Sequence, residues 1–312
     1  MHKRVAVILL NWNTPAHTVN CIISLKAHCN AELFDIIIAD NGSSDKSLPY
    51  LQSLYPDLIF IDNKVNLGFA EGNNVALRYS INHNYAFSLV LNTDTLVDED
   101  IITKLTTHLN ENPSAGAVQP AIYWLHNRSV IWNGKGLFNK FLGKTISDTT
   151  LPNQANSTYE NADWLTGCCM LLRNSALAKS GLFNPKFFLY FEDVDLSFNL
   201  NQAGFELHYL PSCKMYHEAG VSAKVIAQKK EGSLSPIIHY YTSRNHIWIL
   251  RRYGKPLYYP INMVYNGFYY TALLGYLTIR GRFKKSSFLI KGLKDGLLTP
   301  KHLIWSVNKK SI

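Results

Sequence analysis

Short apolar runs alternate with helix-like segments along the N-terminal part of the chain. The apolar runs each stop abruptly at a polar loop, and they occupy residues 5–10, 34–39, 58–61 and 87–91. Between them lie three segments of helix-like composition: 15–30, 45–55 and 70–83. Continuous apolar runs of this length are typical of strands that are buried on both faces of a parallel sheet. The alternation therefore predicts an α/β fold whose polar loops line one edge of the sheet.

The loops after these strands carry the polar residues that could bind a ligand or take part in catalysis. In chain order they are Asn11-Trp12-Asn13, Asp40-Asn41-Gly42-Ser43-Ser44-Asp45, Asn66-Leu67-Gly68-Phe69-Ala70 with Asn73 shortly after, and Asn92-Thr93-Asp94. Asp94 follows its strand where a hard cation bound to a diphosphate would need an oxygen ligand. An ordinary turn with self-capping side chains is the alternative interpretation of this loop.

Gly68 and Gly72 predict a turn that a ligand can approach closely. The helix that follows would present its first N–H groups to an anion. No Gly-x-Gly-x-x-Gly follows the first strand, and no Walker A sequence occurs in the chain. The sequence thus argues against a dinucleotide-binding Rossmann fold and against ATP or GTP hydrolysis.

An acidic helix start follows an aromatic stretch at residues 187–191. Glu192, Asp193 and Asp195 open a predicted helix over 192–203, which ends near Gly204. Acidic residues are favoured in a first helical turn by the helix dipole. The aromatic stretch would also shield a carboxylate from water and increase its affinity for a proton, as a general base requires.

These segments, in this order, resemble the family 2 glycosyltransferases with the GT-A fold, and in particular the rhamnosyltransferase-like branch that acts on bacterial surface polysaccharides. The resemblance covers roughly residues 4–220. It implies a GT-A nucleotide-diphospho-sugar transferase fold with a mostly parallel central sheet. We expect a catalytic domain over 1–230 and a helical, basic, membrane-associating extension over 231–312.

The resemblance also assigns the donor site. It implies donor contacts from Asn11, Asn13, Asp40, Asn41, Gly68, Phe69, Asn73 and Asn92. A carboxylate such as Asp40 can accept from the imide N–H of uracil or thymine, which indicates a UDP- or dTDP-linked donor. An Asx-turn or a helix N-cap is the alternative for Asp40.

The metal site departs from the usual two aspartates of the family, because Asn92 occupies the first position. Asp94 is then the single carboxylate that would hold Mg²⁺ or Mn²⁺ together with the donor diphosphate. The resemblance adds His217, within Tyr216-His217-Glu218, as a second ligand that would favour Mn²⁺. A half-buried, hydrogen-bonded histidine is the alternative.

By resemblance, Asp193 is the general base that deprotonates the acceptor hydroxyl, with Glu192 as the competing candidate. No further carboxylate presents itself as a nucleophile, so a single inverting displacement is expected. Trp164, Thr166 and Gly167 resemble the floor of the acceptor pocket. Residues 120–160 are predicted to form a mobile loop over the site.

The region 236–253 should be a helix that links the catalytic domain to the C-terminal tail. Arg244-Asn245 within it matches a Tyr-x-x-Arg-Asn pattern of the same branch. The guanidinium of Arg244 is suited to binding a diphosphate, and a surface ion pair is the alternative.

Charge and composition indicate a membrane partner. The chain has 312 residues, is 47% hydrophobic and carries a formal net charge of +9, of which residues 280–312 supply +8. A basic tail beside the aromatic, apolar segment 256–279 is typical of a protein bound to anionic lipid. A helical hairpin that forms a homo-oligomer is the alternative, and no nucleic-acid recognition motif accompanies the charge. Five cysteines without a CxxC pair favour reduced thiols, hence a cytoplasmic protein, peripheral on the inner face of the membrane.

The predicted function is the inverting transfer of a sugar, with rhamnose as one candidate, from a nucleoside diphosphate to a saccharide or lipid-linked saccharide. A catalytically silent sugar-nucleotide-binding or scaffold protein is the first alternative. A nucleotidyltransferase is the second, but its Gly-rich, Lys-containing N-terminal loop is missing.

Overall fold

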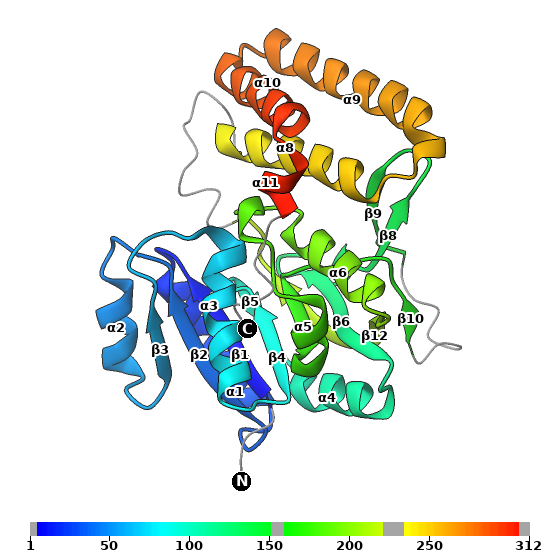
Figure 1. The fold of residues 1–312 in the computed structure, drawn as a ribbon. Helices are drawn as coiled ribbons and strands as arrows, with labels where there is room; N and C mark the ends of the chain where they lie inside the picture. The colour runs from blue at the N-terminus through cyan, green and yellow to red at the C-terminus, as the bar shows by residue number, and fades with distance from the viewer. Residues whose placement is uncertain (1–4, 151–158, 221–233, 306–312) are drawn as a thin grey trace.

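A mixed sheet forms the centre of the molecule (Figure 1), as given by a computed structural model that describes residues 5–150, 159–220 and 234–305. Within these residues ten strands join in the order β10-β12-β6-β11-β4-β1-β2-β3, with β5 on β12 and β7 on β6. Their bounds are β1 Val5–Asn11, β2 Phe34–Asp40, β3 Ile59–Asp62, β4 Phe87–Leu91, β5 Thr95–Leu96, β6 Ala115–Trp124, β7 Ile131–Asn133, β10 Glu160–Asn161, β11 Cys169–Arg173 and β12 Glu206–His217. The strands β3, β2, β1 and β4 are parallel, as their continuous apolar runs predicted, and β11 is antiparallel to its neighbours.

Helices cover both faces of the sheet. On one face lie α1 (Pro15–His28), α2 (Ser47–Leu54) and α4 (Ile101–Glu111); their buried side chains share one core cluster with alternate residues of β1 and β2, and α4 packs mainly on β6 and β12. On the other lie α3 (Gly68–Asn82), α5 (Asn174–Ser180) and α6 (Glu192–Gln202). Successive strand residues point to opposite faces, so one strand supplies apolar contacts to both helical layers. All carboxyl ends of the parallel strands meet at one edge of the sheet.

The C-terminal residues form a helical layer on top of this edge. It consists of α8 (Pro236–Tyr253), the 3₁₀ turn Pro256–Tyr258, α9 (Tyr259–Ile279), α10 (Phe283–Leu298) and α11 (Lys301–Trp305). Figure 1 shows α8 next to the sheet domain and α9 with α10 on its far side. Trp248 of α8 and Ile304 of α11 share a buried cluster with Phe187 and Val194, so the extension completes the core beside the site. Within the described residues no helix is both long and apolar enough to cross a membrane.

The prediction of a loop over 120–160 was wrong for much of that range. Residues 115–124 form β6, and β8 (Lys135–Asn139) pairs with β9 (Lys144–Asp148) as an antiparallel hairpin. Residues 151–158 lie outside the described residues. The range contains many turn-forming residues, but β6 is stabilised by pairing with β11 and β12, which are distant in sequence. Composition within a short window contains no information on such partners.

Candidate active site

A cavity of about 740 Å³ opens at the carboxyl ends of β1, β2 and β4, below α8. Among its lining residues are all of those that the sequence predicted for metal, acceptor and catalytic roles, together with four of those predicted for donor binding. These are Asn41, Gly68, Phe69, Asn92, Asp94, Trp164, Thr166, Gly167, Glu192, Asp193 and His217. The fold thus brings together segments that are more than a hundred residues apart in the chain.

Asp94 and His217 meet on one wall of the cavity. Thr95 of β5 pairs with His217 of β12, which places the preceding Asp94 against the histidine ring. Nε2 of His217 lies 2.9 Å from Oδ1 of Asp94, and both side chains are largely buried. Burial acts to raise the pKa of Asp94, but the hydrogen bond and the charge of His217 together outweigh it, so the pKa lies below its usual value. The carboxylate is therefore ionised and oriented before any ligand arrives.

This pair fits a divalent cation bound jointly with a ligand. Two cis ligands at about 2.1 Å from an octahedral ion lie about 3 Å apart, which matches the separation of Asp94 Oδ1 and His217 Nε2. The described residues contain no cluster of three or more metal-binding side chains. A cation here would therefore need further oxygen ligands, such as those of a diphosphate and water.

Asp193 lies on another wall, next to the segment that leads into β11. Its Oδ2 accepts from the backbone N–H of Gly167 at 3.0 Å, and its Oδ1 accepts from the N–H of Val194 at 2.8 Å. Burial raises the pKa of Asp193, although hydrogen bonds from Gly167 and Val194 act in the opposite direction. The result is a fixed carboxylate that has an increased proton affinity and faces the cavity.

Glu192 shares this wall but has fewer partners. Its Oε2 is buried without a hydrogen bond from any described group. Burial and the adjacent charge of Asp193 raise the pKa of Glu192 well above its ordinary range. Two adjacent buried carboxyls cannot both ionise easily, and the hydrogen-bonded Asp193 is the better site for the negative charge. Asp195 is fully buried and accepts from Tyr253 at 2.6 Å, so it connects α6 to α8 instead of facing the cavity.

The aromatic stretch before these carboxylates adopts an unusual backbone. Phe188, Tyr190 and Phe191 have φ values of 64°, 68° and 68°, in the left-handed region that non-glycine residues seldom occupy. The carbonyl of Phe188 accepts from the N–H groups of Phe69 and Ala70 at 2.6 and 3.3 Å. It thus caps the N-terminus of α3, so these two N–H groups do not meet an anion as the sequence had predicted.

Arg244 and Asn245 of α8 hold this stretch in place. The side-chain amide of Asn245 donates to the carbonyls of Phe187, Leu189 and Tyr190 at 3.0, 2.9 and 2.7 Å. Nη2 of Arg244 donates to the carbonyls of Lys186 and Phe187, both at 2.9 Å. Arg244 does not line the cavity formed by the described residues. Its Nη2 group bonds to the loop and Nε donates to Asn245 Oδ1, so α8 fixes the strained backbone, while the diphosphate contact of Arg244 stays a prediction.

We expect Asn245→Ala to lower both stability and turnover. Three carbonyls would lose their donor in a buried site, which costs roughly 1–3 kcal/mol of unfolding free energy. Because the released loop leads into Glu192 and Asp193, kcat should fall more than donor affinity does. Thermal unfolding and steady-state kinetics measure the two effects. Asn201→Ala, on the exposed side of α6, is the matched control, and equal kcat in the two variants would contradict a positioning role for Asn245.

Several residues that were predicted to bind the donor substrate form hydrogen bonds that support the loops, and they do not line the described cavity. Asn11 donates to Asp40 Oδ2 at 2.8 Å, and Ser43 N–H donates to Asp40 Oδ1 at 2.9 Å. Oδ1 of Asn13 accepts from Ser44 N–H at 2.8 Å. Asn73 donates to the carbonyl of Phe69 at 2.9 Å within α3. The contacts of Asn11 and Asn13 join the loops after β1 and β2, which the isolated motifs could not indicate.

Asn41, by contrast, both lines the cavity and joins two loops. Its side-chain amide donates to Asn66 Oδ1 and to the carbonyl of Gly68, while its Oδ1 accepts from Leu67 N–H.

A Cβ at Gly68, where φ is 77°, would lie 2.5 Å from the carbonyl oxygen of Phe188. Glycine is therefore required here by the crossing of the aromatic loop.

Trp164, which the sequence had singled out, lines the cavity together with residues that it had not. Trp164 donates its indole N–H to the carbonyl of Leu137 at 3.0 Å, which joins it to the hairpin. Trp132 packs edge-on against His217 with ring centroids 4.3 Å apart, and Thr145 and Tyr241 also line the cavity. No motif surrounds Trp132 or Thr145, so the sequence offered no local signal for them, whereas Tyr241 opens the Tyr-x-x-Arg-Asn pattern, which could have marked it.

Comparison with known proteins agrees with this geometry. The sequence model described as "Glycosyl transferase family 2" matches residues 6–181. The N-acetylglucosaminyl-diphospho-decaprenol L-rhamnosyltransferase of Mycobacterium tuberculosis is 25% identical over 230 residues, which cover 68% of this chain and 75% of that protein. The low-salt glycan biosynthesis hexosyltransferase Agl10 of Haloferax volcanii is 24% identical over 196 residues, which cover 62% of this chain and 60% of the relative.

Among solved structures, GalNAc-T7 with UDP, GalNAc and Mn²⁺ superposes with a TM-score of 0.64 at 13% identity. The alignment covers 82% of this chain and 50% of that one. The fold is that of the GT-A glycosyltransferases, and that neighbour was crystallised with a nucleotide and a divalent cation.

Proposed function

The chain belongs to glycosyl transferase family 2, and from this membership we propose that it transfers a sugar from a nucleoside diphosphate to a saccharide or lipid-linked saccharide acceptor, with inversion at the anomeric carbon. The observation that carries this proposal is the cavity in which the Asp94–His217 pair and the Gly167-bound Asp193 occupy different walls. Asp94, His217 and Asp193 all line this one cavity, so a donor held at Asp94 and an acceptor held at Asp193 would share the same space.

The donor diphosphate would bind beside Asp94 and His217. These two residues would hold Mn²⁺ or Mg²⁺, and the bound ion would stabilise the charge on the departing diphosphate. The imidazole nitrogen of His217 favours Mn²⁺ over Mg²⁺. Because the pKa of Asp94 is lowered, its carboxylate is available to a cation over the whole neutral range.

The base of the donor would lie near the loops that follow β1 and β2. Asp40 is 2% exposed and already accepts from Asn11 and Ser43. Each carboxylate oxygen has more than one lone pair, so a contact with the imide of UDP or dTDP is compatible with these bonds. The proposed donor site therefore includes a contact between the Asp40 carboxylate and the imide of the base.

The acceptor would enter between Trp164 and the aromatic loop. Asp193 would take the proton from the acceptor hydroxyl as that oxygen attacks the anomeric carbon, and the diphosphate would leave from the opposite face. The backbone N–H of Gly167 fixes Oδ2 of Asp193, so little reorganisation is needed at the moment of transfer. A lipid-linked acceptor and a rhamnosyl donor are supported by the name of the mycobacterial relative.

A thermal-shift panel of nucleotide-sugars with Mn²⁺ or Mg²⁺ tests the proposal. A ligand at a hundred times its Kd adds about 2.7 kcal/mol to the unfolding free energy, so the preferred donor should raise the melting temperature clearly. Incubation of that donor with water and with candidate acceptors then separates an enzyme from a binding protein. Donor binding without any hydrolysis or transfer would favour the catalytically silent alternative. An NMR coupling constant of the product reports inversion or retention.

A further inference from the structure

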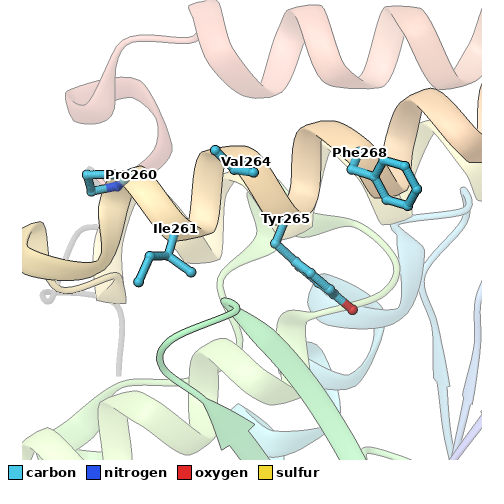
Figure 2. A pocket seen from close by; sticks show the side chains of 5 residues that line it. All are labelled: Pro260, Ile261, Val264, Tyr265 and Phe268. Atoms are coloured by element: carbon cyan, nitrogen blue, oxygen red, sulfur yellow. The ribbon is translucent and has the colours of Figure 1, made fainter.

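The outward side of α9 exposes several large apolar side chains. None of its 21 residues carries a charge. Val264, Phe268 and Ile279 are 75%, 76% and 88% exposed, although apolar side chains of this size are normally buried. Figure 2 shows Val264 and Phe268 together with Pro260, Ile261 and Tyr265 along a shallow pocket on this helix.

The opposite side of α9 is firmly attached to the protein. Asn262 donates to the carbonyl of Lys140 at 3.2 Å, and Asn266 donates to that of Leu142 at 2.9 Å, both in the turn of the β8–β9 hairpin. The hydroxyl oxygen of Tyr270 lies 2.7 Å from Nδ1 of His246 in α8. The helix therefore lies flat on the protein and leaves one long side free.

Exposed cations flank α9 at both of its ends and continue along the chain that follows it. Between residues 255 and 305 the exposed cations are Lys255, Arg280, Lys284, Lys291, Lys294 and Lys301. The single acidic residue in this range, Asp295, accepts from the hydroxyl of Tyr240 at 2.8 Å. The surface thus combines exposed apolar side chains with uncompensated positive charge at both ends of α9.

We propose that the free side of α9, with the tip of the β8–β9 hairpin, docks on an anionic lipid bilayer. The apolar side chains would enter the boundary between headgroups and acyl chains, the tyrosines would lie at the headgroups, and the cations would meet anionic lipid. A second copy of the chain would bring the same positive charge against this surface, and like charges oppose such a contact. The charge pattern therefore selects the bilayer.

The docking surface connects directly to the acceptor side of the cavity. Phe141 at the hairpin tip is 54% exposed and stacks on Tyr258 with ring centroids 4.2 Å apart. The same hairpin supplies Thr145 to the cavity lining. This part of the inference rests on the proposed function, because a lipid-linked acceptor would then reach the cavity from the bilayer beside the hairpin.

The test compares the full chain with Val264→Glu/Phe268→Glu in vesicle flotation. The vesicles contain phosphatidylcholine alone or phosphatidylcholine mixed with phosphatidylglycerol. Loss of two apolar side chains that would insert into the bilayer should weaken binding to the mixed vesicles at least roughly tenfold. Ile23→Glu/Tyr50→Glu, on exposed positions of α1 and α2, is the matched control and should bind like the unmodified protein. Added salt should weaken binding without abolishing it, because apolar insertion is not screened.

Equal flotation of the α9 variant and the control variant would overturn the proposal. So would a dimer, seen by light scattering, that the α9 substitutions dissociate without any vesicle binding by the unmodified protein. Melting temperatures show whether the variants fold. Donor binding is measured on the same samples without lipid, and its absence in the unmodified protein would refute the proposed function while leaving vesicle docking as a separate result.

Discussion

Replacing Asp193 by asparagine is expected to slow sugar transfer roughly a hundredfold to ten-thousandfold, the usual range for a lost general base. The amide oxygen of the new side chain can still accept from Gly167 N–H, but its NH2 would then face the N–H of Val194, so the melting temperature is measured as the control for the loop geometry. Donor affinity should change little, because the contacts predicted for the diphosphate lie at Asp94 and His217. Single-turnover kinetics with saturating donor, together with calorimetric donor binding, measure the two quantities separately.

Glu192→Gln distinguishes the two neighbouring carboxyls. Its side chain also lines the cavity, but its Oε2 has no described partner and its raised pKa favours the neutral form. A glutamine in its place should therefore retain most of the turnover. Near-normal transfer by Asp193→Asn combined with a collapse in Glu192→Gln would assign the base to Glu192. Asp195→Asn serves as the structural control, since Asp195 contacts α8 and should affect the melting temperature more than kcat.

The pH dependence of transfer should show the same carboxyl. Burial raises the pKa of Asp193, and the reaction needs its deprotonated form. Turnover should therefore fall as the pH decreases through this raised pKa, at a pH above the value of about 3.9 that an exposed aspartate shows. Since Asp193 and Glu192 are neighbours, the acidic side of the pH profile reports the ionisation of the two carboxyls as a pair. A kcat that stays constant down to the pH of an ordinary aspartate would contradict the assignment of a buried base.

The parallel half of the sheet was predictable because its signals are local. β1, β2 and β4 are short runs of mostly apolar residues, so their burial can be predicted from the run itself, and the polar residues after each run mark the end of the strand. The predicted helix over 236–253 is α8, with the same bounds. These elements need no distant partner to be recognised from composition and periodicity.

The assembly of the site depends on contacts that no local window contains. Asp94 and His217 are 123 residues apart, and they meet because β5 pairs with the end of β12. β12 runs from Glu206 to His217, so that its far end reaches β5. Likewise, Asn245 bonds a loop 55 to 58 residues earlier in the chain. The Tyr-x-x-Arg-Asn pattern suggested phosphate binding. In the structure, Arg244 and Asn245 donate to the carbonyls of residues 186–190, whose backbone conformation the sequence could not reveal.

Asp94→Asn should reduce the metal-dependent part of donor affinity at least roughly a hundredfold. Loss of a residue that merely supports a ligand already costs about ten- to a hundredfold in metal affinity, and Asp94 is proposed as a direct ligand. The asparagine oxygen can still face His217 Nε2, so the melting temperature without ligand should be nearly unchanged. Calorimetry of donor binding with Mn²⁺, with Mg²⁺ and with chelator measures the metal-dependent part.

A matched control and a second variant make the metal assignment specific. Asp62 also ends a parallel strand but forms an exposed ion pair with Lys64 and does not line the described cavity, so Asp62→Asn should bind the donor normally. His217→Gln replaces an imidazole nitrogen by an amide and should reduce binding with Mn²⁺ more than binding with Mg²⁺, because nitrogen ligands favour the transition metal. Unchanged metal dependence in Asp94→Asn would show that the cation, if one binds, lies elsewhere. An equal loss with both ions in His217→Gln would instead assign the histidine to orienting Asp94, since a ligand nitrogen must discriminate between the two metals.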